Sequence, residues 1–289
     1  MPILPLLAWL VLAQAPAAAP QRLTSSSELV VLNVTVLEKK AHVSGLPREA
    51  FAILEDGKPQ PLGFFENADL PSTVGLVIDS SISMHRRREA VIAAGSSFAE
   101  SSHPDDELFT INFNERVWPG LPDGRMFTSD RDELRRALAS IGARGQTAFY
   151  DGVSTALRHL EKGSRQKKVL VVVSDGGDNV SRTTFEEVLQ AALKMDAVIY
   201  TVSIRDEYDS EGRPDVLKKL AAATGGEAFF LRHSREVAPA FQRIARDIRS
   251  GYTLGYTPEP GRSGYRAVKV LVQSSNRNLT VRCRSGYQR

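Results

Sequence analysis

The sequence has a single cysteine, Cys283, among its 289 residues, so no disulfide can form within the chain. This excludes the class of small exported domains that depend on disulfides for their stability. Cys283 lies in LTVRCRS, where it shares one face of an expected strand with Leu279 and Val281. We therefore expect a thiol that packs in a core and is not reactive.

A strong excess of charge is also absent, because 37 basic residues nearly balance 34 acidic ones and leave a net charge of +3. No nucleic acid partner is expected from such a balance. The sequence has no G-x-x-x-x-G-K-S/T loop and no G-x-G-x-x-G segment after a strand, so nucleotide binding has no support. None of the five histidines lies in a recognisable triad motif, and nucleophilic catalysis has no support either.

Long hydrophobic segments are missing except at the N-terminus. Residues 1–19 combine an apolar run with a tail of small residues, which predicts a secretory signal peptide. An uncleaved membrane anchor is the alternative, although the run is short for a bilayer span. We expect an exported bacterial protein, periplasmic, on the cell surface or extracellular, whose contact with membranes is peripheral if there is any.

The pattern of apolar residues divides the chain into three regions after the leader. Residues 24–70 and 251–289 are rich in expected strands, whereas residues 71–250 alternate short apolar strands with amphipathic helices. This alternation predicts an α/β domain with a doubly wound, mostly parallel sheet. A chain that enters such a domain by its first strand and leaves by its last helix brings both flanks to the same side. We expect the two flanks to form one β-domain there.

Three local signals support these elements. Asp56-Gly57 stands between two apolar runs and predicts a β-hairpin. Pro214 and Gly225 are typical of the start and the end of a helix. Pro239 conflicts with the last expected helix, residues 234–250, unless it lies in the first turn.

Oxygen-bearing side chains follow the first strand of the expected sheet. Asp79 ends TVGLVID, and the spacing D-x-S-x-S adds the hydroxyls of Ser81 and Ser83. One carboxylate and two hydroxyls from a single turn can converge on a small hard cation. Capping of the following helix is the alternative, since Asp and Ser are also preferred at helix N-termini.

A second strand end favours the metal site over helix capping. KKVLVVVSDGGDN is a buried strand that ends near Asp175, at the same edge of a parallel sheet. The Gly-rich segment GARGQTAFYDGV brings the hydroxyl of Thr147 to the start of a helix. The sequence therefore predicts a divalent metal site with five ligand side chains: Asp79, Ser81, Ser83, Thr147 and Asp175.

This set resembles the metal-ion-dependent adhesion site of the von Willebrand factor type A (VWA) domain, over about residues 71–250. The flanking segments AFAILEDGKPQPLGFFE, SGYTLGYTP and RSGY look like the exported VWFA-related proteins described from Acidobacteria. The resemblance implies a Rossmann-like fold and Mg²⁺, with Mn²⁺ or Ca²⁺ as alternatives. It implies that Ser81, Ser83 and Thr147 supply hydroxyl ligands, that the two aspartates hold the ion mostly through water, and that a partner protein's Asp or Glu takes the remaining position.

Two other functions compete with adhesion. A Mg²⁺-dependent phosphoryl hydrolase of the haloacid dehalogenase kind also places Asp at the end of its first strand, but it needs a carboxylate at position 81, where this chain has Ser. A scaffold subunit of a chelatase-like assembly would use the same fold and metal without catalysis. We expect no enzymatic activity.

The run Arg86-Arg87-Arg88 lies near the expected site and could attract an acidic partner, with a solvated helix face as the alternative.

Overall fold

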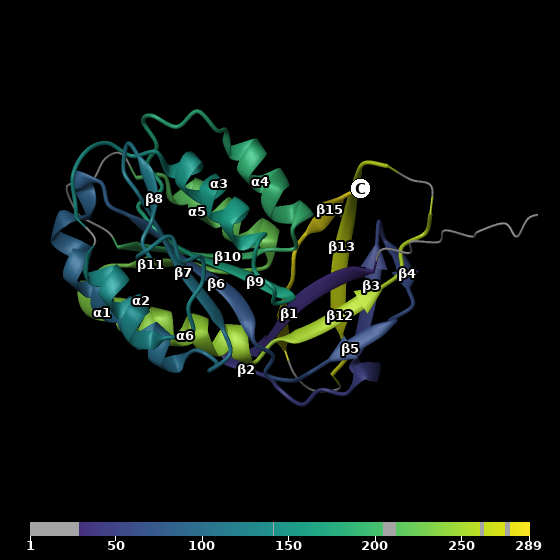
Figure 1. The fold of residues 1–289 in the computed structure, drawn as a ribbon. Coiled ribbons are helices and arrows are strands. Elements are labelled where there is room, and N and C mark those ends of the chain that lie inside the picture. Colours follow the sequence, from purple (N-terminus) through teal and green to yellow (C-terminus); the bar gives the residue numbers. More distant parts are fainter. Residues whose placement is uncertain (1–28, 141, 205–211, 261–262, 275–277) are drawn as a thin grey trace, which may run out of the picture.

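The computed structural model describes residues 29–140, 142–204, 212–260, 263–274 and 278–289. The expected signal peptide at residues 1–19 lies outside the described residues. The described chain forms a helix-covered sheet at one end and a β-sandwich at the other (Figure 1). None of its helices is both long and apolar enough to cross a membrane.

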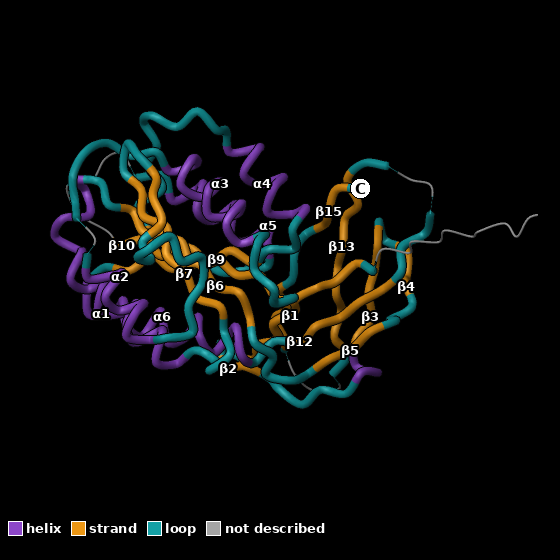
Figure 2. The backbone as a smooth tube through the Cα atoms, in the orientation of Figure 1, coloured by secondary structure: helices purple, strands orange, loops and turns teal. Residues whose placement is uncertain are grey.

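The central sheet contains, among the described residues, six strands in the order β11-β10-β9-β6-β7-β8. All neighbours pair in parallel except β7 and β8, which are antiparallel. Helices cover both faces, which explains why every residue of β6 is buried (Figure 2). The doubly wound, mostly parallel sheet is thus confirmed. Its strands are β6 (Ser72–Asp79), β7 (Glu107–Phe113), β8 (Val117–Pro119), β9 (Lys167–Val173), β10 (Val198–Ile204) and β11 (Ala228–Leu231).

The described helices form two groups, which cover the two faces of this sheet (Figure 1). One face carries α1 (Arg88–Ser101), α2 (Arg131–Ala139) and α6 (Val237–Arg249). The other carries α3 (Phe149–Leu160), α4 (Phe185–Lys194) and α5 (Pro214–Thr224). Short 3-10 turns are η1 (Arg48–Ala50), η2 (Ile82–Arg87) and η3 (Ser234–Glu236).

The helix boundaries follow the expected start and stop residues. Pro214 is the first residue of α5, and Gly225 ends it with φ of 83°, a left-handed conformation that glycine adopts without strain. Pro239 is the third residue of α6, where no intrahelical partner is lost, so the conflict noted in the sequence disappears. Thr184 and Glu187 form a capping box at the start of α4.

The flanks of the chain form a sandwich of two antiparallel sheets. The first sheet has the order β14-β1-β12-β5 with β2 paired to β1, and the second has the order β15-β13-β3-β4. Both sheets mix strands from before and after the central domain, so the expected β-domain built from both flanks is confirmed. The placement of the boundaries at residues 71 and 250 stays a prediction. The strands are β1 (Val30–Glu38), β2 (Ala41–His42), β3 (Phe51–Glu55), β4 (Lys58–Gln60), β5 (Phe64–Glu66), β12 (Tyr252–Tyr256), β13 (Tyr265–Val272), β14 (Leu279–Arg282) and β15 (Gly286–Gln288).

The hairpin at Asp56-Gly57 differs in one respect from the sequence prediction. Both residues have positive φ, 48° and 81°, as a two-residue hairpin turn requires. The strand that pairs with β3 is the polar β4, however, and the apolar run of β5 pairs with β12 in the other sheet. The second apolar run was therefore not the hairpin partner, because it is needed to extend the opposite sheet.

A buried charged cluster lies inside the sandwich. Arg266 is 1% exposed, and its guanidinium donates to Glu55 Oε1 at 2.9 Å. The hydroxyls of Tyr256 and Tyr287 donate to Glu55 Oε2 at 2.6 and 2.8 Å. Burial alone would raise the pKa of Glu55, but these donors outweigh it and hold the pKa below its usual value. The cluster joins β3, β12, β13 and β15, and therefore ties both flanks together.

The sandwich is also tied to the last helix of the central domain. Asp247 of α6 is fully buried, pairs with Arg282 of β14 and forms a hydrogen bond with His42 of β2. Arg282 also pairs with Glu227, in the segment before β11. Burial would raise the pKa of Asp247, yet the hydrogen bond from His42 and the charge of Arg282 lower it overall. The end of α6 is thus anchored by charge to the β-sandwich.

Candidate metal centre

The candidate site begins where two neighbouring strands end. β6 and β9 run parallel with Ile78 opposite Val173, so the residues after both strands meet at one edge of the sheet. The chain continues from β6 to β7 on one side, whereas β9 lies on the other. Such a change of direction leaves a crevice at the carboxyl ends of the strands, and ligands of α/β sheets bind there. This edge faces away from the β-sandwich (Figure 1).

Four of the five expected ligands form one hydrogen-bonded chain at this edge. Asp79 Oδ1 accepts from the backbone N–H of Ser81 at 2.9 Å and from its hydroxyl at 2.5 Å. The hydroxyls of Ser81 and Ser83 are 3.1 Å apart. The Ser83 hydroxyl donates to Asp175 Oδ2 at 2.9 Å. Side chains 92 residues apart in sequence are therefore in direct contact, as the metal hypothesis requires.

Thr147 reaches the same edge through its backbone. Its loop is held against the segment after β6 by two hydrogen bonds, from the N–H of Arg144 to Ser80 O at 2.8 Å and from the N–H of Ile82 to Gly145 O at 3.2 Å. The Thr147 residue is 8% exposed. Within the described residues, no hydrogen bond joins its hydroxyl to the other four side chains. Its assignment as a ligand stays a prediction.

Two residues of the site were missed by sequence reasoning. The Ser174 hydroxyl donates to Asp79 Oδ2 at 2.7 Å and accepts from the N–H of Gly176 at 3.0 Å. Asn179 holds Thr147, since its Oδ1 accepts from the N–H of Thr147 at 3.1 Å and its own N–H donates to Thr147 O at 2.9 Å. Both lie in SDGGDN, next to a residue that was recognised. Their polar side chains at a buried strand end were the available signal.

The electrostatics of the site fit a bound cation. Asp79 is 2% exposed, and burial raises its pKa to about 6, against the hydrogen bonds from Ser81 and Ser174. The nearby charge of Asp175 raises it further. Among the described residues, no Lys or Arg forms an ion pair with either carboxylate. Two neighbouring carboxylates without a positive partner, together with hydroxyl oxygens, are a donor set for a hard divalent ion.

The candidate site has few charged or imidazole ligands. In the described part of the chain, no group of three His, Cys, Asp or Glu side chains could hold a metal ion. The candidate site has two carboxylates, and its remaining oxygens come from hydroxyls. Such a set leaves net positive charge on a divalent ion, which matters for what the ion could bind next.

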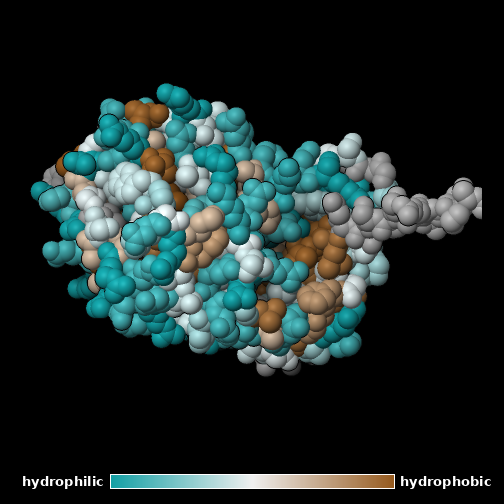
Figure 3. All heavy atoms as spheres, viewed as in Figure 1, coloured by the Kyte–Doolittle hydropathy of each residue, from teal (hydrophilic) through white to brown (hydrophobic). Residues whose placement is uncertain are grey.

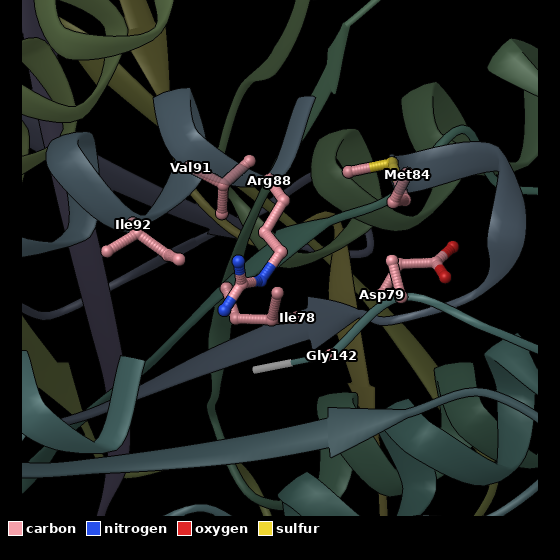
Figure 4. A pocket seen from close by; sticks show the side chains of 8 residues that line it. Ile78, Asp79, Met84, Arg88, Val91, Ile92 and Gly142 are labelled. Carbon is pink, nitrogen blue, oxygen red and sulfur yellow. The ribbon is translucent and has the colours of Figure 1, made fainter. Parts of the chain in front are cut away.

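A small apolar pocket lies beside Asp79 (Figure 4). Its volume of about 10 Å³ leaves room for one water molecule at most. Figure 4 shows the Asp79 carboxylate pointing away from the apolar side chains of this pocket, toward the edge of the sheet. The pocket is therefore too small for a substrate and faces away from the carboxylate. Its lining includes Ile78, Met84, Arg88, Val91, Ile92 and Gly142.

The three consecutive arginines after the site do not form one solvated face. Arg87 is 4% exposed and packs on Met84, with its Nη1 3.7 Å from the sulfur. Arg88 donates to Ala139 O at 3.0 Å, which connects α1 to α2. Of the three, Arg86 alone is exposed. Both interpretations of this run were thus incomplete, because two of the three residues have structural contacts.

Comparison with known families decides the nature of the domain. Residues 74–177 match the family model of the von Willebrand factor type A domain. The chain contains a VWA domain. All five expected ligands lie inside the matched segment, which includes β6 and β9, the two strands that end at the candidate site. No curated protein matches the chain in sequence.

Solved structures show the same fold at low sequence identity. The von Willebrand factor type A protein from Catenulispora acidiphila is 15% identical, with a TM-score of 0.55, and the match covers 89% of this chain and 72% of that one. The vWF domain of the type V pili tip protein Mfa5 from Porphyromonas gingivalis is 16% identical, with a TM-score of 0.53, over 63% of this chain and 96% of that one. Proximal thread matrix protein 1 from the mussel byssus, described as having a zinc-occupied MIDAS motif, is 15% identical, with a TM-score of 0.52, over 67% and 49%.

Proposed function

We propose that the VWA domain binds a divalent cation through Ser81, Ser83 and Thr147, with Asp79 and Asp175 holding it mostly through water. The observation that carries this proposal is the hydrogen-bonded chain from Asp79 to Asp175, which joins two strand ends around oxygen atoms. Mg²⁺ suits this donor set best because it prefers oxygen ligands and keeps several waters. Mn²⁺ and Ca²⁺ are the alternatives.

The bound ion then serves as a contact for a protein partner. Hydroxyl ligands leave the ion electropositive, so a carboxylate from an Asp or Glu of the partner is attracted to its open position. Ile82, between the two serine ligands, is 65% exposed, and an apolar side chain next to the ion suits a protein partner better than a free anion. The protein is thus a non-catalytic adhesion or assembly protein, exported to the periplasm, the cell surface or the medium.

The chemistry of the site supports binding over phosphoryl transfer. A hydrolase of the haloacid dehalogenase kind needs a second carboxylic acid two residues after Asp79, to act as general acid and base. The side chain at that position is the Ser81 hydroxyl, which donates to Asp79. A serine hydroxyl cannot replace a carboxylic acid in that role, because it does not exchange its proton readily near neutral pH.

Isothermal titration of the full chain with Mg²⁺ tests the metal site. Asp79→Asn and Ser83→Ala should each weaken binding by about tenfold or more, while circular dichroism shows an unchanged fold. Ser80→Ala is the matched control, because its buried hydroxyl lies on the same loop and has no hydrogen-bond partner among the described residues. Unchanged Mg²⁺ affinity in both ligand variants would refute the site.

Partner binding needs a separate measurement. Immobilised protein is incubated with envelope extracts in Mg²⁺ or in EDTA, and retained proteins are identified by mass spectrometry. A partner that is retained only in Mg²⁺ and is lost with Asp79→Asn supports the proposal. Retention that does not depend on the metal would contradict a metal-mediated contact.

A further inference from the structure

Four exposed arginines lie on four different segments at the edge of the sheet that carries the candidate metal site. They follow β6, β7, α2 and β9 along the chain, and all four loops lie at the edge where Asp79 and Asp175 meet. The end of the molecule that carries this edge, at the left of Figure 3, is mostly hydrophilic. We name this set the arginine rim: Arg86, Arg116, Arg144 and Arg182.

Backbone hydrogen bonds hold two of these loops against the metal loop. The N–H of Arg144 donates to Ser80 O at 2.8 Å, one residue from a proposed ligand. Asn114 connects Arg144 to Arg116, because its side-chain amide donates to Arg144 O at 3.0 Å and its N–H donates to Arg116 O at 2.9 Å. Arg86 lies in η2, three residues after Ser83. Positive charge is therefore built into the frame around the site.

Arg182 belongs to the loop on the opposite side of the site. This loop follows β9 and includes Asp175 and Asn179, and Asn179 holds the backbone of Thr147. The N–H of Arg182 donates to Asp151 Oδ2 at 3.1 Å, which fixes the loop on the first turn of α3. The loops that carry the rim thus lie on both sides of the candidate site.

Glu115 and Asp151, two acidic residues beside the rim, are already engaged by backbone donors. Glu115 accepts from the N–H of Gln146 at 3.1 Å. Asp151 accepts from the N–H of Thr183 at 2.9 Å in addition to that of Arg182, and such hydrogen bonds lower its pKa despite partial burial. Within the described chain, none of the four rim guanidinium groups forms an ion pair. By contrast, Arg213, next to the same edge, is paired with Asp215.

We propose that the arginine rim binds an acidic segment of the protein partner, in which further Asp or Glu residues flank the carboxylate on the metal. This inference rests on the proposed function, since the metal supplies the central contact. Guanidinium groups match carboxylates with two parallel hydrogen bonds, and exposed charges of one sign accelerate encounter with the opposite sign. The rim therefore selects among partners that could all supply one carboxylate.

Two labelled peptides and the full chain test the proposal by fluorescence anisotropy in Mg²⁺. One peptide is a Gly-Ser sequence with a single central Asp, and the other has the same length with additional Asp residues on both sides. At an ionic strength of about 0.15 M, the acidic peptide should bind at least about tenfold more tightly. Its advantage should disappear at about 1 M salt, where exposed charges are screened.

Charge-matched variants separate the rim from general electrostatics. Replacement of all four rim arginines by Gln should remove the advantage of the acidic peptide and leave Mg²⁺ binding unchanged. The control variant loses the same number of positive charges on the distant β-sandwich, and it should still bind the acidic peptide more tightly than the other peptide. Its four exposed lysines, also replaced by Gln, are Lys39, Lys40, Lys58 and Lys269.

The outcomes distinguish failure of the rim from failure of the metal site. If the two peptides bind equally well and only in Mg²⁺, the rim proposal is refuted and the metal site is still supported. The same conclusion follows if the acidic peptide still binds more tightly to the rim variant. Binding of neither peptide also refutes the rim. Binding that persists in EDTA with Asp79→Asn refutes the proposed metal contact itself. Equally tight binding of a single-stranded oligonucleotide of the same charge would show a general polyanion surface and overturn selection of an acidic protein segment.

Discussion

The Ser174 hydroxyl donates to Asp79 Oδ2 across 2.7 Å and thereby joins the ends of β9 and β6. Asp79 Oδ1 is held from the other side by Ser81. Both oxygens of one buried carboxylate are thus fixed before any ion arrives. Oriented ligands lose less conformational entropy on binding, so Ser174 acts as a positioning residue for the candidate metal site.

Ser174→Ala should therefore weaken Mg²⁺ binding although Ser174 is not a proposed ligand. We expect the affinity to fall by about tenfold or more. The free energy of unfolding should fall by about 1–3 kcal/mol, because Asp79 and the N–H of Gly176 each lose a buried partner. Calorimetric titration and urea unfolding measure the two effects. Ser102→Ala, which removes a buried hydroxyl hydrogen bond to Phe98 O far from the site, should change stability alone.

Asn179→Ala should loosen Thr147 without removing a ligand. The side chain of Asn179 accepts from the N–H of Thr147, so its loss removes one of the hydrogen bonds that hold Thr147 and leaves the backbone bond from the Asn179 N–H. We expect Mg²⁺ affinity to fall by about tenfold. Asn179→Asp keeps an acceptor at this position and should retain most of the affinity. Equal titration curves for the alanine variant and the wild type would show that Thr147 needs no support or is not a ligand.

Gly176→Ala tests the turn that places Asp175. Gly176 has φ of 85°, and a Cβ there would lie 2.8 Å from the carbonyl oxygen of Arg213. We expect a loss of about 1–2 kcal/mol from the left-handed backbone and a further loss from the clash, together with weaker Mg²⁺ binding. Gly124→Ala is the control, because Gly124 also has positive φ, 67°, but has open space around it. Similar unfolding energies for the two variants would contradict the clash.

Arg282→Gln should leave the Asp247 carboxylate buried without its arginine partner, with His42 as its remaining side-chain contact. Loss of one partner of a buried pair costs about 3–5 kcal/mol of unfolding free energy at neutral pH. The pKa of Asp247 is lowered in the fold, so the stabilisation is complete above the unfolded pKa of about 3.9 and is lost as the pH falls through the folded pKa. The difference between wild type and variant should therefore narrow below about pH 4.

Urea unfolding at several pH values measures this difference. Arg135→Gln is the control, because Arg135 pairs with Asp132 on the surface of α2 and both side chains are more than half exposed. Its effect should stay below about 1 kcal/mol. A difference for Arg282→Gln that does not change with pH would show that packing, and not charge, holds the sandwich against α6.

The sequence alone was enough to predict the class of fold and the proximity of four of the five expected ligands. Strands and helices of the central domain follow from apolar periods of two and 3.6 residues, which are local properties. Asp79, Ser81 and Ser83 share one turn, and Asp175 follows a buried strand, so their proximity needed only the rule that parallel strands end at one edge. Pro214 and Gly225 likewise carry their conformational preferences in their own covalent structure.

The tertiary structure alone decided how distant segments share contacts. The contact of Ser174 with Asp79 depends on the register of β6 and β9, and that of Asn179 with Thr147 depends on how two loops fold over α3. The transfer of β5 to the opposite sheet and the separate contacts of Arg86, Arg87 and Arg88 depend in the same way on what lies beside them. Patterns in sequence report the neighbours of a residue along the chain. Register, loop packing and charge pairing are set by neighbours in space, where burial and hydrogen bonding are satisfied across the whole molecule.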